Sequence, residues 1–190
     1  MKIIVGLGNP GAKYRSTRHN VGYLILSELA VRLAAGSKPK ARFHADMLDI
    51  SYRGEQVLFL CPTTFMNRSG TSVSEAVRFY KLPPENVLVI CDDFNIPFAK
   101  LRFRTDGSAG GQKGLADIIR LLGTDKIPRM RFGIGPPGEH QDAADFVLAD
   151  FNEAEKKALP LELKRAADAV ECFLSEGLTE AMNRFNGTGQ

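Results

Sequence analysis

The stretch KIIVGLGNPG, residues 2–11, decides the fold of this 190-residue chain. Its first half is a continuous apolar run of strand length, and glycine, asparagine and proline follow at once, so it predicts a buried strand that ends in a loop. The next segment, NVGYLILSELAVRLA over 20–34, has apolar residues at helical spacing. A buried strand, a loop and a helix in this order are typical of an α/β protein.

Strand-like and helix-like segments alternate along the rest of the chain. Strands are predicted at 43–50, 55–61, 87–91, 100–104 and 129–135, and helices at 69–81, 113–123 and about 152–186. A turn is expected at Arg53-Gly54. The alternation predicts one α/β domain over 1–190, with a mixed, mostly parallel twisted sheet, helices on both faces and a helical C-terminal third.

Composition and charge narrow the class of protein. A hydrophobic content of 44% fits one globular domain with a buried core. The apolar runs have strand length and the N-terminus lacks the apolar segment of a secretory signal, so we expect a cytoplasmic protein with no membrane partner. Three widely spaced cysteines are typical of free thiols in a reducing compartment. The net charge of +3 is too small to identify a polyanion partner.

Polar loops follow several of the predicted strands. In open α/β sheets the ligand crevice lies outside the carboxyl ends of the strands, where loops from distant segments converge. The loops at these points are 8–10, 63–67, 92–93 and 107–111. We therefore expect their side chains to gather in one site.

Residues 6–11, GLGNPG, match the dinucleotide-binding pattern GxGxxG. In that pattern the last glycine opens a helix whose N-terminus holds pyrophosphate, whereas here AKYRSTR intervenes. Pro10 also removes a backbone donor from the loop. We therefore expect no nucleotide cofactor; a tight turn would explain the glycines but not Asn9.

His19 is the candidate general base. It lies among polar residues at the start of a predicted helix, and imidazole titrates near neutrality. A base that activates water needs an orienting partner on its other ring nitrogen, and Asp92, after a buried strand, fits that role. The alternative is that Asp92 and Asp93 only cap the next turn. No second histidine or acidic cluster at ligand spacing accompanies them, so no metal is expected.

Asn9 and Asn67 each follow a predicted strand. Their amides offer a donor and an acceptor, which suits them to bind a peptide backbone or position water. Asparagine is also common in turns, and for Asn67 alone that explanation would be preferred.

Two strands carry alternating arginines, Arg102 and Arg104 on one and Arg129 and Arg131 on the other. Each pair faces one side of its strand, so together they predict a guanidinium patch suited to RNA phosphate. A solvated sheet face is the alternative.

Several segments resemble the bacterial peptidyl-tRNA hydrolase family in order and approximate spacing. They are VGLGNPGAKYRSTRHNVGY, CPTTFMNRSG, VICDDFNIPFAKLRFR, GSAGGQKGLADII and RMRFGIGPPG. The resemblance implies an ester hydrolase that acts on peptidyl-tRNA, bound by its acceptor stem and CCA end, and releases free tRNA and an N-substituted amino acid or peptide. It implies no cofactor and no metal, and we expect a monomer.

The resemblance also implies a role for each catalytic residue. His19 would activate water as the base, and Asp92 would orient it. Asn9 and Asn67 would organise the water and the peptide.

A further set would bind the substrate. Tyr14 and Met66 would line the cleft, and Arg104 and Arg131 match basic positions that clamp the terminal phosphate of the acceptor stem. Lys113 lies where the family's usual GGHNG reads GGQKG, at 110–114. It replaces an asparagine that helps hold water or the peptide carbonyl.

The change at Lys113 leaves two hypotheses. The lysine could donate to the developing oxyanion or bind acceptor-end phosphate, while Gln112 retains some hydrogen bonding. Alternatively, the chain is a non-catalytic RNA-binding homologue, like the splicing factors that resemble this family. The presence of His19, Asp92, Asn9 and Asn67 favours the hydrolase.

Overall fold

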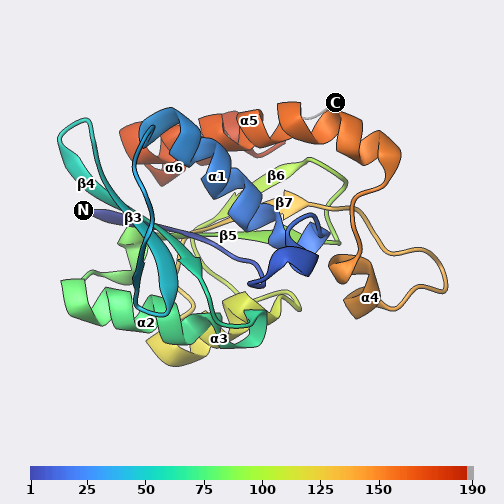
Figure 1. Cartoon of the computed structure of the whole chain (residues 1–190), viewed down its shortest axis with the longest axis horizontal. Coiled ribbons are helices and arrows are strands. Elements are labelled where there is room, and N and C mark those ends of the chain that lie inside the picture. The colour runs from blue at the N-terminus through green and yellow to red at the C-terminus, as the bar shows by residue number, and fades with distance from the viewer. Residues whose placement is uncertain (188–190) are drawn as a thin grey trace.

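The computed structural model describes residues 1–187 and is built on a seven-stranded sheet in the order β2-β3-β4-β1-β5-β7-β6 (Figure 1). The strands are β1 (Lys2–Gly6), β2 (Lys40–Arg42), β3 (Ala45–Tyr52), β4 (Glu55–Pro62), β5 (Val87–Asp93), β6 (Leu101–Arg104) and β7 (Arg129–Gly133). Strands β4, β1, β5 and β7 are parallel, whereas the pairs β2–β3, β3–β4 and β6–β7 are antiparallel. This confirms the predicted mixed sheet, with its parallel strands in the centre.

Helices cover both faces of the sheet (Figure 1). One face carries α1 (Val21–Leu33), α5 (Glu153–Glu176) and α6 (Leu178–Phe185), and the other carries α2 (Ser69–Tyr80) and α3 (Lys113–Leu122). The short helix α4 (Ala143–Leu148) lies at one end of the sheet. The helical C-terminal third is confirmed. The predicted domain also includes residues 188–190, which lie outside the described part of the chain.

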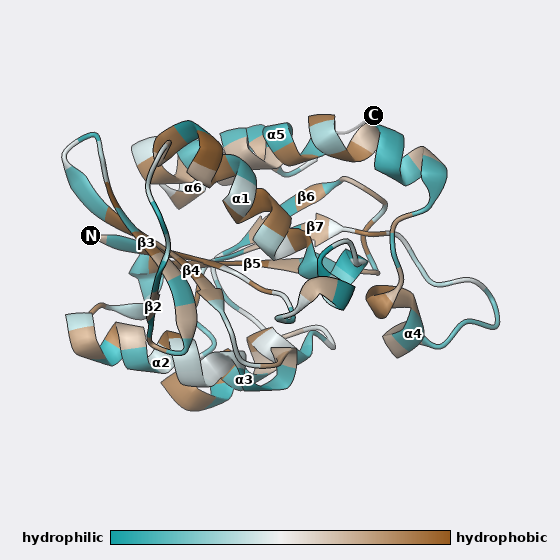
Figure 2. Ribbon diagram, in the orientation of Figure 1, coloured by the Kyte–Doolittle hydropathy of each residue, from teal (hydrophilic) through white to brown (hydrophobic). Residues whose placement is uncertain are grey.

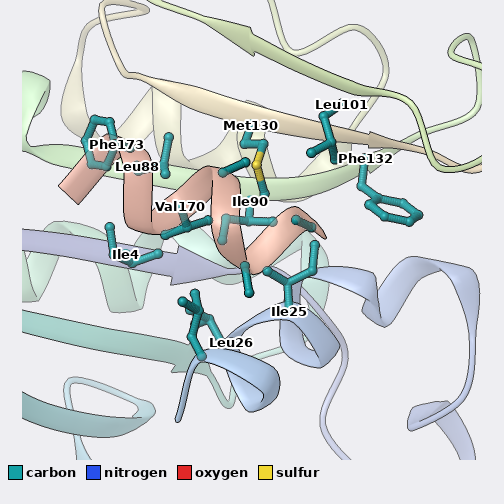
Figure 3. Close-up of a cluster of buried hydrophobic side chains, with 14 of the residues drawn as sticks. Ile4, Ile25, Leu26, Leu88, Ile90, Leu101, Met130, Phe132, Val170 and Phe173 are labelled. Atoms are coloured by element: carbon teal, nitrogen blue, oxygen red, sulfur yellow. The ribbon is translucent and has the colours of Figure 1, made fainter. Parts of the chain in front are cut away.

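The sheet separates two apolar cores, because successive side chains of a strand point to opposite faces. On one face Ile4 and Ile90 pack with Ile25 of α1 and Val170 of α5 (Figure 3). On the other face, Val5 belongs to the core that α2 and α3 cover. The central strands are therefore apolar along their length, whereas the helices carry both hydrophilic and hydrophobic residues (Figure 2).

Two glycines let α1 approach β1 closely. A Cβ atom at Gly22 would lie 2.4 Å from the backbone nitrogen of Leu7, and one at Gly6 would lie 2.4 Å from the carbonyl oxygen of Gly22. Helix α1 begins at Val21 rather than at the last glycine of GLGNPG. The first glycine thus serves helix–strand packing, and the start of α1 is fixed beside the end of β1.

Some details differ from the sequence-based expectations. The exposed edge strand β2 and the helix α4 were not predicted. The loop after 100–104 was expected to leave the sheet at its carboxyl edge, but β6 runs antiparallel to β7 and its last residue, Arg104, pairs with Arg129 at the start of β7. The chain then returns toward the carboxyl edge before α3. Within residues 1–187, no helix has the length and apolar character needed to cross a bilayer.

Candidate active site

A cavity of about 590 Å³ opens at the carboxyl ends of the parallel strands. The residues that line it are Asn9, His19, Phe65, Met66, Asn67, Asp92, Asp93, Phe94, Gly110, Gly111, Gln112, Lys113, Ala143, Ala144, Val147 and Leu148. The loops after β1, β4 and β5 therefore meet here with the start of α3, as the sequence predicted. Helix α4, which was not predicted, supplies the remaining side.

His19 and Asp92 form a buried pair in this cavity. Nδ1 of His19 lies 2.8 Å from Oδ2 of Asp92, and the two side chains are 10% and 3% exposed. Because a carboxylate oxygen accepts, Nδ1 carries a proton, and in the neutral ring the lone pair is then on Nε2. Nε2 has no hydrogen-bond partner among residues 1–187, so it is the nitrogen available to water or substrate.

The adjacent carboxylate, Asp93, has a different role. Its Oδ1 accepts from the backbone N–H of Asn95 at 2.8 Å, and its Oδ2 accepts from Nη1 of Arg131 at 2.7 Å. The turn-capping alternative therefore holds for Asp93 and not for Asp92. The described residues include no group of three or more His, Cys, Asp or Glu side chains that could hold a metal ion.

Asn9 is fixed by hydrogen bonds to two other loops. Its backbone N–H donates to Oδ1 of Asn20 at 2.8 Å, and Nδ2 of Asn20 donates back to its carbonyl at 2.9 Å. Oδ1 of Asn9 accepts from the backbone N–H of Met66 at 2.8 Å. The Nδ2 donor of Asn9 has no partner in the described chain and is available to the cavity. Asn20 was not predicted as a site residue, because its place beside His19 was its only distinguishing feature in the sequence.

The side of the cavity formed by α4 is apolar and is held in place by Arg18. Val147 and Leu148 of α4, and Phe65 of the loop after β4, give the cavity an apolar lining and were not singled out from the sequence. The guanidinium of Arg18 lies 4.4 Å from the ring centroid of Phe146 in α4, and Nη2 forms an ion pair of 2.7 Å with Glu155. The residue that precedes His19 thus also holds helix α4, which lines the cavity.

A second, smaller pocket of about 350 Å³ adjoins the first and shares Asp93 and Gly110 with it. Arg102, Arg104 and Arg131 all line it, and Arg102 pairs directly with Arg131 across the β6–β7 ladder. Three of the four arginines of the predicted guanidinium patch therefore line this pocket.

Arg129 does not belong to this patch. It is fully buried, because the loop between β6 and α3 covers it, and it donates to the carbonyls of Gly107 (2.7 Å) in that loop and Asp125 (2.9 Å) in the loop before β7. Burial, and next the charge of Arg131, lower the pKa of its guanidinium. The expectation that Arg129 would face a ligand was wrong: alternation predicted its face of the strand but not the loop that covers it.

Comparison with known proteins agrees with this geometry. The sequence model of the family described as "Peptidyl-tRNA hydrolase" matches residues 3–190. The chain belongs to the peptidyl-tRNA hydrolase family. The peptidyl-tRNA hydrolase of Rhodopirellula baltica is 47% identical over 186 residues, which cover 98% of this chain and 97% of that protein. That of Chloroflexus aurantiacus is 47% identical over 187 residues, covering 98% and 99%.

Solved structures support the same assignment. A crystal structure of peptidyl-tRNA hydrolase from Acinetobacter baumannii superposes with a TM-score of 0.90 at 33% identity, covering 98% of this chain and 95% of that one. The family resemblance read from the sequence is thereby confirmed.

Of the other residues that the family resemblance suggested for the cleft, three line the cavity and Tyr14 does not. Met66 is buried in the cavity lining, while Asn67 and Lys113 line it with exposed side chains. Tyr14 is half-buried in the turn before α1, where Nζ of Lys13 lies 4.7 Å from its ring centroid, and it is not among the lining residues.

Gln112 stands where peptidyl-tRNA hydrolases usually have histidine, and it contributes more than the sequence indicated. Its Oε1 caps α3 by accepting from the backbone N–H of Leu115 at 2.8 Å. Its Nε2 lies 3.2 Å from Oδ1 of Asp92 and 3.2 Å from Sδ of Met66. The loop that departs from the family pattern therefore contacts the carboxylate of Asp92 directly.

Proposed function

We propose that this protein hydrolyses the ester bond between peptide and tRNA in peptidyl-tRNA, releasing free tRNA and an N-substituted amino acid or peptide, and so recycles tRNA from aborted translation. The observation that carries the proposal is the buried His19–Asp92 pair. Nε2 of His19 is free, and His19 lines the same cavity as Asn9 and Asn67. Membership of the peptidyl-tRNA hydrolase family supports it. The relatives reported above give no support to the RNA-binding alternative.

His19 acts as the base in the proposed reaction. Nε2 takes a proton from water while the water oxygen attacks the ester carbonyl carbon, and Asp92 stabilises the imidazolium through Nδ1–H. The tetrahedral intermediate then breaks its bond to the ribose oxygen, which receives the proton from Nε2. Asn9 and Asn67 hold the water and the peptide through their amides. The mechanism requires no metal ion, because His19 supplies the base.

Lys113 takes over the task of the missing family asparagine. It is the first residue of α3, where a cation opposes the helix dipole by about 0.3–1 kcal/mol, so helix stability does not explain it. No ion pair involves it in the described chain, and it lines the cavity. Its ammonium donates to the oxyanion or to acceptor-end phosphate.

The arginine pocket binds the terminal phosphate of the acceptor stem in this proposal. Arg131 is held by Asp93 at 2.7 Å, and Arg104 is exposed at the same pocket. Guanidinium groups bind phosphate through charge-assisted hydrogen bonds. Met66 contacts the substrate from within the cavity, and Tyr14 does so from the loop before α1.

We also propose that the protein acts in the cytoplasm as a monomer. Its cysteines Cys61, Cys91 and Cys172 are free thiols, which fits a reducing compartment. Its substrate is formed where translation takes place.

The test measures release of N-acetyl-aminoacyl groups from charged tRNA by wild type, His19→Ala and Lys113→Asn, with unblocked aminoacyl-tRNA as the specificity control. We expect the wild type to cleave only the blocked substrate, and His19→Ala to bind tRNA without cleaving it. If the wild type binds tRNA but cleaves nothing, and Lys113→Asn restores turnover, the protein is an RNA-binding relative that has lost its chemistry.

A further inference from the structure

The side chain of Gln112 links the catalytic carboxylate to helix α3. Its Oε1 accepts from the backbone N–H of Leu115 at 2.8 Å, and its Nε2 lies 3.2 Å from Oδ1 of Asp92. Only the oxygen of an amide can accept from a backbone N–H. The helix cap therefore fixes the orientation of the amide and directs its NH₂ group toward Asp92.

Both oxygens of Asp92 are engaged as a result. Oδ2 accepts from Nδ1 of His19 at 2.8 Å, and Oδ1 accepts from Gln112. Asp92 is 4% exposed and Gln112 is 7% exposed, so solvent has little access to replace either bond. Rotation of the carboxylate would break one of these hydrogen bonds, and a buried bond to a charged group is worth more than one in water.

The absence of a side chain at Gly114 leaves room for the amide of Gln112 beside Asp92. A Cβ atom at Gly114 would lie 2.6 Å from Sδ of Met66 and 3.1 Å from Oε1 of Gln112. Glycine at this position therefore allows the thioether and the amide to pack against the start of α3. Glutamine also does not titrate, so its donor is present at every pH at which the enzyme is folded.

We propose that Gln112 is a positioning residue for the hydrolysis: it holds the Asp92 carboxylate in the orientation that receives Nδ1–H of His19 and leaves Nε2 free for water. The inference rests on the proposed function and deepens it, because it assigns the support of the base to the segment that departs from the family pattern.

The decisive variant is Gln112→Glu, which has nearly the same shape. Its carboxylate can still cap Leu115 N–H, but at pH 8 it faces the buried carboxylate of Asp92, so the urea midpoint falls at pH 8 and recovers as the pH is lowered. It loses the donor to Asp92, and kcat at pH 8 falls about ten-fold or more with little change in KM. As the pH is lowered, the two adjacent carboxylates share one proton, which restores a donor, so activity relative to wild type rises.

A purely capping role makes the opposite prediction. Gln112→Glu would then keep wild-type kcat, with a ratio to wild type that does not change with pH, and this result would overturn the proposal. A second variant, Gln112→His, restores an N–H donor and is expected to recover most of the lost kcat. Equal kcat values in the Glu and His variants would also overturn it.

NMR titration of His19 gives a readout that does not depend on turnover. In Gln112→Glu the extra carboxylate should keep the His19 imidazolium to higher pH than in wild type. An unchanged His19 titration would count against the proposed contact. A wild type that cleaves no peptidyl-tRNA would contradict the proposed function instead, so the two failures can be told apart.

Discussion

Oδ1 of Asn9 accepts a hydrogen bond from the backbone N–H of Met66 at 2.8 Å, and so ties the loop after β1 to the loop after β4. The same amide leaves its Nδ2 donor to the cavity. One side chain thus combines a structural contact with a proposed substrate contact, and a single substitution can separate them.

Asn9→Asp keeps an oxygen that accepts from Met66 but loses the Nδ2 donor. We expect its unfolding free energy to stay close to that of wild type, while turnover of N-acetyl-aminoacyl-tRNA falls about ten-fold or more. Asn9→Ala, the control, loses both contacts and leaves a buried N–H unpaired, so its stability should also fall by about 1–3 kcal/mol. Full activity of Asn9→Asp would show that the donor is not needed.

The close approach of α1 to β1 leads to a second prediction. Gly22→Ala places a Cβ 2.4 Å from the backbone nitrogen of Leu7, so the helix must move away from the sheet. We expect the free energy of unfolding, measured in urea, to fall by about 1–3 kcal/mol or more. Activity per folded molecule should also fall, because His19 lies just before α1. In the control, Gly138→Ala, the new Cβ has its nearest neighbour at 3.8 Å, and equal stabilities of the two variants would contradict this account.

The elements predicted from the sequence are those whose pattern is determined locally. The central strands are apolar along their length because both faces are covered, and that pattern is visible without tertiary information. Strand β2, Lys40–Arg42, has three exposed residues and no apolar pattern, so it forms only because β3 offers an edge for pairing. Helix α4 buries Phe146 alone and depends on Arg18, a contact distant in sequence.

The contacts of the candidate site also fall into those that the sequence predicts and those that depend on the tertiary structure. His19 and Asp92 could be paired from the sequence because each lies at the end of an element that leads to one edge of the sheet. The sequence left open whether Asp92 and Asp93 only cap the next turn, and it did not show that Asn20 and Gln112 hold their neighbours. Those choices depend on loops that meet only in the folded chain.

The thiol of Cys91 provides a test of the core beneath the site. Burial is the main cause that raises its pKa to about 12, followed by the charge of Asp92. At pH 8.5 the thiolate is then a minor species, and iodoacetamide should leave Cys91 unlabelled in the native protein and label it in guanidinium chloride, as shown by mass spectrometry. Rapid native labelling would show that this core opens readily.

The raised pKa of the Cys91 thiol also makes the stability of the protein depend on pH. The unfolded thiol ionises near pH 8.5 whereas the folded thiol stays neutral until about pH 12, so the contribution of Cys91 is complete below pH 8.5 and is lost as the pH rises toward 12. Cys91→Ala should therefore show a smaller decrease in urea midpoint between pH 7 and pH 10 than wild type. An identical decrease would contradict the assignment to Cys91.

Arg18 connects the segment that contains His19 to helix α4, which lines the cavity. It forms an ion pair of 2.7 Å with Glu155, donates to the carbonyl of Asp150 at 2.6 Å and stacks on Phe146. Arg18→Met keeps much of the side-chain volume but leaves Glu155 without its ion-pair partner, so we expect the free energy of unfolding to fall by about 3 kcal/mol. Because α4 is then less firmly held, KM for peptidyl-tRNA should rise more than kcat falls.

Arg32 offers a matched control, since it also links helices through carboxylates, at Glu28, Asp168 and Glu171, and lines neither pocket. These pairs are more exposed, so Arg32→Met should reduce stability by about 1 kcal/mol and leave KM unchanged. Kinetics and urea unfolding of both variants separate the two effects. If Arg18→Met lowers stability but leaves KM at the wild-type value, Arg18 only stabilises the fold, and the position of α4 does not depend on it.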